Sequence, residues 1–252
     1  NLAMERARPF SALPELSKPF TNEALFLSGR AAEKLEKKEQ AITAYERLTA
    51  SAPTDPFTEK AMSRLAFLYE HKEAEQNLVR YEKHFAEGKH LGEIRLKVAE
   101  ARFSAGDTDG AASLYAKLLK QPATSVTTIP ATYGAAWCSL RSDKLAEADQ
   151  GFAAVSKAKD APPEMHQDAL LQRGEIAYRQ KEFGAACPFF EAVKDDPTRG
   201  ERAVYMLGWC SRKLDDVKAE EHWFREAVSK HPKGRFQVDS TLRLAELHNH
   251  LG

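Results

Sequence analysis

The sequence predicts an all-α fold in which about six helical hairpins and one terminal helix stack into a solenoid. Apolar residues recur three and four positions apart along most of the chain, which is typical of amphipathic helices. No useful stretch alternates with the period of two that strands require. Glycine and proline are expected between the helices and not inside them. A pattern of small and aromatic residues also repeats at a regular interval, which indicates a repeat architecture.

Each repeat has a small anchor residue, a second small residue twelve positions later and an aromatic residue four positions after that. The stretch RGEIAYRQKEFGAACPFFEAV supplies Gly174, Ala186 and Phe190. A small side chain lets two helices approach closely, so we expect each anchor where the helices of a hairpin cross, with the aromatic ring filling the space toward the next hairpin. Successive anchors lie 37, 33, 37, 38, 34 and 37 residues apart, and they are Gly29, Ala66, Ala99, Ala136, Gly174, Gly208 and Ala245.

The elements are expected in a regular order along the chain. The predicted hairpins are 22–56, 57–90, 91–124, 129–162, 164–197 and 199–232, and a final helix follows at 236–250. Asp55 before Pro56 predicts a capped helix start, and Pro163 predicts a proline-led one. Thr198 and Glu201 have the spacing of a capping box. Short polar segments inside each hairpin favour antiparallel helices.

Two hairpins and one terminal segment depart from the pattern. Asn77 or Leu78 replaces the small residue of the second hairpin, and Glu220 replaces that of the sixth, so these hairpins are expected to be the least regular. Residues 1–21 lie outside the repeat and contain four apolar side chains, which would cover the first hairpin as a cap. The alternative is that residues 1–21 form a mobile tail and not a cap.

This pattern resembles the tetratricopeptide repeat, a unit of two antiparallel helices, over roughly residues 22 to 252. The resemblance implies a right-handed α-solenoid whose first helices line a concave face. It also implies a non-enzymatic scaffold that binds a partner peptide or helix in that groove. The family's groove positions with aromatic or arginine side chains fall on Tyr133, Trp137, Arg141, Tyr178, Arg179, Tyr205, Trp209 and Arg212.

Two interpretations of these groove residues remain open. Tyr, Trp and Arg dominate binding hot spots, and the arginines would suit an acidic segment. Alternatively, Trp137 and Trp209 pack against the next hairpin, and the arginines form a solvated stripe.

Composition and motifs argue against other classes of protein. Lys plus Arg and Asp plus Glu number 37 each, so no net field would attract nucleic acid. No apolar run approaches the roughly 18 residues of a membrane-spanning helix. Phosphate-binding, hydrolase and zinc motifs are missing from the sequence, so we expect no catalytic residues, metal site or cofactor.

The three cysteines and the chain ends bear on location and on a second hypothesis. Cys138, Cys187 and Cys210 are expected to be buried reduced thiols, with a Cys187–Cys210 bridge as the alternative. The stretch HPKGRFQVDSTLRLAEL is similar to repeats of bacterial cell-envelope proteins of this family, which favours a periplasmic or outer-membrane-associated location over a cytoplasmic one. A chain that begins with Asn1 is expected to be processed, designed or part of a longer protein. The alternative function is a regulatory or targeting arm of a larger enzyme or secretion machine.

Overall fold

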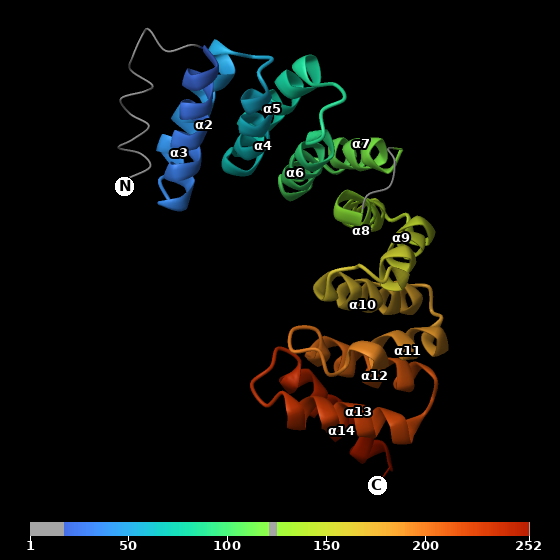
Figure 1. Ribbon diagram of the computed structural model, residues 1–252. Coiled ribbons are helices and arrows are strands. Elements are labelled where there is room, and N and C mark those ends of the chain that lie inside the picture. Colours follow the sequence, from blue (N-terminus) through green and yellow to red (C-terminus); the bar gives the residue numbers. More distant parts are fainter. Residues whose placement is uncertain (1–17, 121–124, 252) are drawn as a thin grey trace. The chain divides into compact units, whose positions relative to one another are not determined.

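The computed structural model describes residues 18–120 and 125–251, which form thirteen helices and, within those ranges, no strand (Figure 1). The predicted all-α solenoid is therefore confirmed. The part of residues 1–21 expected to form a cap lies mostly outside the described residues, since α2 begins at Lys18. The helices are α2 (Lys18–Lys34), α3 (Lys38–Ser51), α4 (Pro56–Leu68), α5 (His71–His84), α6 (Leu91–Ser104), α7 (Thr108–Leu119), α8 (Ser125–Arg141), α9 (Leu145–Lys157), α10 (Pro163–Arg179), α11 (Phe183–Val193), α12 (Gly200–Lys213), α13 (Val217–Lys230) and α14 (Gln237–Leu251).

The chain divides into two compact units, residues 1–134 and 135–252, and the boundary falls within α8. In the first unit each helix from α2 to α7 packs against the next one along the chain. In the second unit the same consecutive packing runs from α9 to α14. Each unit is therefore a stack of helical hairpins in which contacts are local, as expected for repeat proteins.

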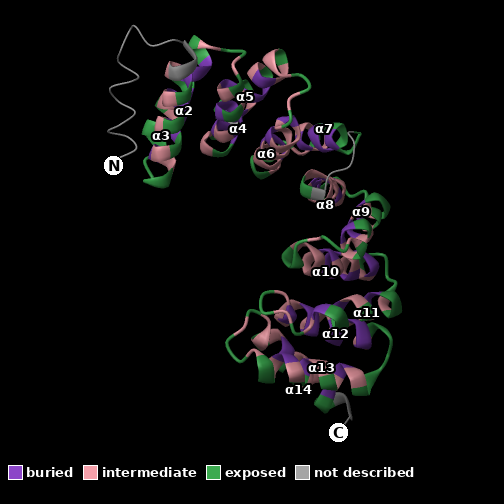
Figure 2. Ribbon diagram, in the orientation of Figure 1, coloured by how far each residue is buried: buried purple, intermediate pink, exposed green. Residues whose placement is uncertain are grey.

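The core of each hairpin is built around one aromatic ring of its second helix. Figure 2 shows the buried residues of the helices in purple. A Cβ atom added to Gly174 would lie 2.7 Å from the Phe190 ring, and one added to Gly208 would lie 2.7 Å from the Phe224 ring. The ring therefore covers the glycine of its own hairpin, whereas the sequence suggested that it mainly fills the space toward the next one. The six rings are at most 2% exposed, and they belong to Tyr45, Tyr81, Tyr115, Phe152, Phe190 and Phe224.

Two tyrosines of this set, Tyr45 and Tyr81, make hydrogen bonds that phenylalanine could not make. The Tyr45 hydroxyl donates to Glu33, and the Tyr81 hydroxyl donates to Glu59 Oε1 at 2.8 Å. Burial, followed by the bond to Glu33, raises the pKa of Tyr45. A buried hydroxyl usually requires such a partner, so Glu33 and Glu59 are part of the core arrangement of their hairpins.

Helix starts confirm one capping prediction and correct another. Asp55 Oδ1 accepts from the Phe57 amide at 2.7 Å, with Pro56 at the first helical position, as predicted. The Thr198–Glu201 capping box is wrong. Asp196 Oδ1 instead accepts from the Thr198 and Arg199 amides at 2.9 and 2.8 Å. Glu201 Oε1 accepts from the more distant Phe236 amide at 2.9 Å.

Prolines and glycines both lie inside helices, which corrects the expectation that they only separate them, and Gly174 in α10 and Gly208 in α12 are examples. Pro130 lies in α8 and Pro188 in α11. Helix α8 accordingly begins at Ser125, upstream of the predicted hairpin start at 129. In α11 the proline side chain is exposed, as is Gly184. Water can therefore bond the Gly184 carbonyl, which proline leaves without its usual helical donor.

Five hairpin turns share one backbone geometry. In each, the residue two positions past the last helical residue has a positive φ, and the next amide bonds back to a carbonyl five residues earlier at 2.8 to 3.0 Å. This is the Schellman arrangement, which satisfies carbonyls at a helix end. The positive-φ residues are Glu36, Gly106, Asp143, Lys181 and Asp215.

The second hairpin has no such turn. Only Tyr69 and Glu70 separate α4 from α5, and both have negative φ. Asn77, at the position of the usual small residue, is fully buried and donates from Nδ2 to the Met62 carbonyl at 2.8 Å. A polar side chain thus replaces a close helix crossing with a hydrogen bond between α4 and α5.

Arginine–carboxylate pairs join consecutive hairpins in both units. Isolated pairs of this kind contribute at most about 1 kcal/mol each when partly exposed, so their main effect is on the register of one hairpin on the next. The pairs between hairpins include Arg64–Glu33, Arg95–Glu82, Arg173–Asp149 and Arg202–Glu175.

Candidate functional site

Aromatic rings and guanidinium groups gather on α12, on α14 and at Phe236 just before α14, all in the second unit. The Tyr205 ring stacks on the Phe236 ring with centroids 4.3 Å apart and an interplanar angle of 13°. The Trp209 ring lies beneath two guanidinium groups, 5.6 Å from that of Arg212 and 5.1 Å from that of Arg243. We call these five residues the aromatic–arginine surface. Such rings present a large, rigid contact area whose faces attract cations.

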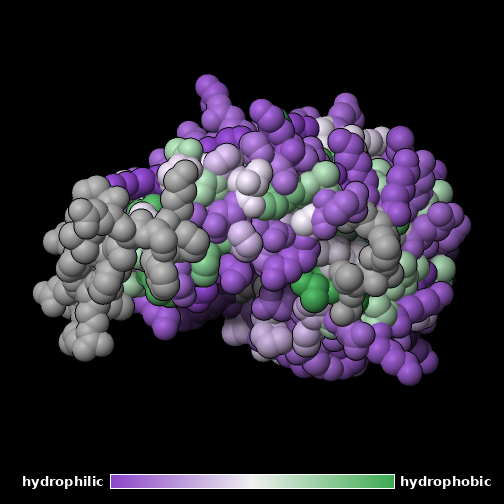
Figure 3. Space-filling view, turned by 45° about the horizontal axis from the view of Figure 1, so that its top comes forward, coloured by the Kyte–Doolittle hydropathy of each residue, from purple (hydrophilic) through white to green (hydrophobic). Residues whose placement is uncertain are grey.

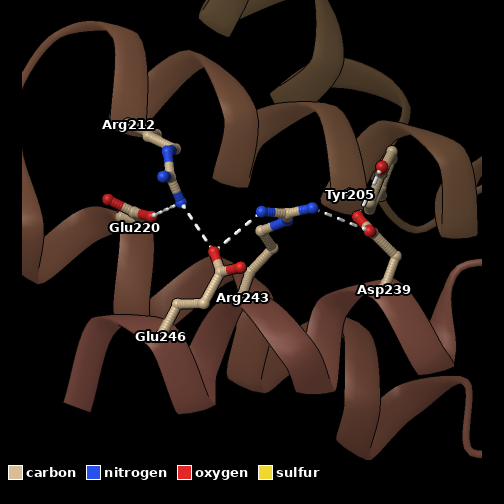
Figure 4. A network of polar contacts seen from close by, with 6 residues as sticks. All are labelled: Tyr205, Arg212, Glu220, Asp239, Arg243 and Glu246. Atoms are coloured by element: carbon tan, nitrogen blue, oxygen red, sulfur yellow. Dashed lines mark hydrogen bonds and ion pairs between the residues drawn. The ribbon is translucent and has the colours of Figure 1, made fainter. Parts of the chain in front are cut away.

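A chain of polar contacts runs along this surface (Figure 4). The Tyr205 hydroxyl donates to Asp239 Oδ2 at 2.8 Å. Arg243 pairs with Asp239 at 3.3 Å and with Glu246 at 2.7 Å. Arg212 lies 3.6 Å from the same Glu246. The side chains of Tyr205 and Arg212 on α12 are therefore held in place by acidic residues of α14.

Glu220 on α13, the second helix of the sixth hairpin, is the last member of this series of polar contacts. Its Oε1 lies 3.4 Å from Arg212 Nη1 (Figure 4), and the residue is only 5% exposed. Burial raises the pKa of Glu220 above its usual value, although the Arg212 guanidinium opposes the shift. The residue predicted to make this hairpin irregular is thus a buried acid that contacts the candidate site.

Replacing Glu220 with glutamine is expected to stabilise the protein at neutral pH. Because the pKa of Glu220 is raised in the folded protein, its ionised form costs folding free energy. Below the usual value of 4.5 the carboxyl is protonated in both folded and unfolded chains, so the cost is absent there. The free-energy cost of ionising Glu220 grows as the pH rises from 4.5 to the raised pKa of the folded protein. Urea unfolding at a series of pH values measures this effect. The free energy of unfolding of Glu220→Gln should exceed that of the natural protein by an amount that increases with pH.

The matched control for this prediction is Glu221→Gln on the same helix. Glu221 is partly exposed and pairs with Arg225 and His248 at the surface. This change should alter the free energy of unfolding by less than about 0.5 kcal/mol. A Glu220→Gln variant that is less stable than the natural protein at neutral pH would show that the ion pair with Arg212 outweighs burial.

The other predicted groove residues are not drawn into this cluster. Trp137 is half-buried and meets the Phe152 ring edge-on at 5.6 Å, within its own hairpin. Tyr178 meets the Phe183 ring at 5.1 Å. Arg179 is exposed and pairs with Asp143 at 2.6 Å. Trp209 has a similar edge-on contact with Phe224 at 6.0 Å, so packing within the hairpin and a partly exposed face coexist in this side chain.

The remaining two predicted residues lie on α8 together with Trp137, and the unit boundary separates them along the sequence. Tyr133 is half-buried and belongs to the first unit. Arg141 is exposed and is the last residue of α8, in the second unit.

Sequence reasoning missed the α14 side of the surface. Phe236 and Arg243 were not predicted, nor were Asp239 and Glu246, which bind the arginines and Tyr205. One signal was present, because Asp239, Arg243 and Glu246 have the four- and three-residue spacing of one helix face. Their contacts with α12 depend on how the final helix packs.

A cavity of about 850 Å³ lies in the first unit, on a different set of elements. It is lined mainly by α5, with contributions from α3, α6 and α7. Tyr69 lies at its edge and donates to Glu46 Oε1 at 2.7 Å, and burial raises the pKa of Tyr69 to about 12. Acidic and basic side chains both line it, including Glu75, Arg80 and Lys117, so the cavity selects no sign of charge.

The hydropathy of the surface and the arrangement of metal-binding side chains bear on other kinds of site in the described residues. The face drawn in Figure 3 is mostly hydrophilic, with hydrophobic side chains in small separate groups. Within residues 18–120 and 125–251, no group of three or more His, Cys, Asp or Glu side chains is arranged to hold a metal ion. In the same residues, no helix combines the length and the apolar character needed to cross a membrane.

Comparison with known protein families agrees with the helical-hairpin architecture. The family model of the tetratricopeptide repeat matches residues 23–55 and 93–124, which contain hairpins α2–α3 and α6–α7. These two segments match the tetratricopeptide repeat, and other hairpins stack in the same consecutive way. Repeats of this family are generally non-catalytic, and they build scaffolds for protein–protein interaction. Among curated proteins, none matches the sequence significantly.

Solved structures with the same fold are distant in sequence. The C-terminal part of a TPR repeat-containing protein from Cytophaga hutchinsonii has a TM-score of 0.72 at 13% identity, over 94% of this chain and 92% of that one. YrrB, described as a TPR protein with an unusual peptide-binding site, has a TM-score of 0.61 at 13% identity, over 80% and 99%. PilW, a widely conserved type IV pilus biogenesis factor, has a TM-score of 0.60 at 13% identity, over 89% and 99%. Identities this low establish a shared fold only.

Proposed function

We propose that the protein binds a segment of a partner protein, a peptide or a helix, on the aromatic–arginine surface of its second unit. The observation that carries the proposal is Trp209, whose ring contacts the guanidinium groups of Arg212 and Arg243 while remaining partly exposed. Trp and Arg are the residues most enriched in binding hot spots. The scaffold function of the repeat family supplies the context.

The surface is already ordered before any partner arrives. Tyr205 is fixed by its stacking on Phe236 and its bond to Asp239, and Arg243 is fixed by two carboxylates. Side chains that are held in place lose less conformational entropy on binding. A partner would therefore meet a preformed patch and gain the burial of aromatic area.

The charge of this patch favours apolar contacts over an acidic partner. The two guanidinium groups of Arg212 and Arg243 are surrounded by the three carboxylates of Glu220, Asp239 and Glu246. An acidic segment would have to compete with these internal partners. We accordingly expect a binding segment with aromatic or aliphatic anchors, and an affinity that changes little with ionic strength.

The test compares partner capture by matched variants. Immobilised natural protein and the double variant Trp209→Ala/Arg212→Ala are each exposed to a bacterial envelope extract, and retained proteins are quantified by mass spectrometry. Proteins that bind this surface should be depleted about tenfold or more with the double variant, since a hot-spot residue contributes at least about 1–2 kcal/mol. Synthetic segments of the recovered proteins then give affinities by calorimetry.

The control removes the same residue types from the second helix of the same hairpin. Trp223→Ala/Arg225→Ala on α13 should retain the partners, and circular dichroism should show equal helix content for all three proteins. Equal retention of every protein by the natural protein and the Trp209/Arg212 variant would refute the proposal. Loss of helix content in that variant would instead assign these residues to packing.

We further propose that the partner belongs to a bacterial envelope assembly. The repeat style of the sequence and the fold shared with PilW, a pilus biogenesis factor, support this assignment. Running the experiment above with a cytosolic extract in parallel tests this assignment, because partners recovered only from the cytosolic extract would contradict it.

A further inference from the structure

Two of the three cysteines lie on helices that face each other in the second unit. Cys187 belongs to α11 and Cys210 to α12, and these helices pack together as the junction between the fifth and sixth hairpins. Both side chains join one apolar cluster, in which Cys210 is fully buried and Cys187 is partly exposed. Both thiols are free in this structure.

The two thiols share one apolar environment. Burial raises the pKa of both, and the neighbouring Cys187 raises the pKa of Cys210 further. The Cys187 thiol donates to the Phe183 carbonyl of its own helix at 3.3 Å. Cys138, the third cysteine, is buried on α8 and belongs to neither helix of this junction.

We propose that Cys187 and Cys210 form a reversible intramolecular disulfide that locks the fifth hairpin onto the sixth. The facing helices supply proximity, and the partial exposure of Cys187 supplies access for an oxidant. The repeat pattern itself does not require cysteine here, since the buried small residue of the fifth hairpin is the adjacent Ala186. This site is independent of the proposed partner-binding surface.

The oxidant is a disulfide, either a small molecule of the oxidised-glutathione class or a protein disulfide. The Cys187 thiolate attacks one sulfur of that disulfide, forming a mixed disulfide and releasing the other sulfur as a thiolate. The Cys210 thiolate then attacks the Cys187 sulfur, which forms the Cys187–Cys210 bond and releases the second external sulfur. The cysteines lose two electrons and two protons in total, and the external disulfide becomes two thiols.

Burial sets the pace of this reaction. Because the pKa of each thiol is raised, little thiolate exists at neutral pH, and the rate of bond formation should increase with pH. Once formed, the bond closes a loop that contains the end of α11 and most of α12. Closing this loop restricts the unfolded chain, and the melting temperature should rise by about 5–10 °C.

The experiment treats the full chain, folded and without denaturant, with oxidised glutathione at about pH 8, where more thiolate is present. Remaining thiols are alkylated, and a tryptic digest is analysed without reduction. We expect peptide 182–194 linked to peptide 203–212, lighter by two hydrogen atoms than the reduced pair, with Cys138 alkylated. The melting temperature should rise as stated and return after treatment with dithiothreitol.

Three variants separate the outcomes. Cys138→Ala should form the same linked peptide, whereas Cys187→Ala and Cys210→Ala should form none and should show no rise in melting temperature on oxidation. Cys187→Ala is the milder of the two, because its side chain is only partly buried. The proposal is overturned by a stable glutathione adduct on Cys187 without the link, by links between two chains, or by a bond that forms only in urea.

Discussion

Replacing Gly208 with valine is expected to lower the free energy of unfolding of the second unit by about 3 kcal/mol. A Cβ atom at this position would lie 2.7 Å from Cε1 and 2.8 Å from Cδ1 of Phe224. The ring cannot move aside easily, because it is fully buried and meets the Tyr205 and Trp209 rings edge-on. Valine also adds two methyl groups beyond the Cβ atom, so α12 would be forced away from α13. Urea unfolding followed by circular dichroism measures the loss.

The matched control is Gly184→Ala on α11. A Cβ atom added there meets nothing within 4 Å, and Gly184 is exposed. Alanine is favoured over glycine in a helix by up to about 1 kcal/mol, so this variant should gain stability. If Gly208→Val and Gly184→Ala changed the free energy of unfolding by the same amount, glycine at the helix crossing would have no packing role.

Replacing Phe190 with alanine is expected to cost about 3–5 kcal/mol, the range for deleting a fully buried aromatic side chain. Phe190 is 0% exposed, and its ring covers Gly174 of α10. The same ring belongs to a cluster with Ala203 and Leu207 of α12. Its removal would therefore leave a cavity that loosens both the fifth hairpin and its junction with the sixth.

Phe67→Ala provides the comparison for a phenylalanine outside the core. Phe67 is 50% exposed on α4, where its ring contacts the charged groups of Arg64 and Lys97. This variant should lose less than about 1 kcal/mol. If both variants lose the same amount in denaturant unfolding, the aromatic positions of the repeat are not what holds the hairpins together.

The fold could be predicted from the sequence because its determinants are short-range. The Gly174–Ala186–Phe190 spacing lies within one hairpin, and each hairpin packs mainly on its neighbours. The Asp55 cap was predictable for the same reason, since its hydrogen bond spans two residues. The start of α12 was not, because Asp196 forms a turn ahead of the helix and the residue at the cap position, Arg199, makes no side-chain cap hydrogen bond.

The candidate site was predictable only in part. Tyr205, Trp209 and Arg212 follow from their positions on the first helix of a repeat. The partners that define their chemistry come from further along the chain, as in the bond from Tyr205 to Asp239. Such contacts depend on how α14 packs on the sixth hairpin, which no local pattern encodes. The sequence therefore indicated free arginines, whereas Arg212 is paired with Glu220 and Glu246.

The positive φ angles of the hairpin turns indicate how the thermal stability of the protein could be increased. Only Gly106 among the five positive-φ turn residues lacks a side chain, while Glu36, Asp143, Lys181 and Asp215 each hold a conformation that L-amino acids resist. All four are exposed, so glycine could replace them without disturbing the interior. Glycine at these four positions should therefore raise the melting temperature without changing the aromatic–arginine surface.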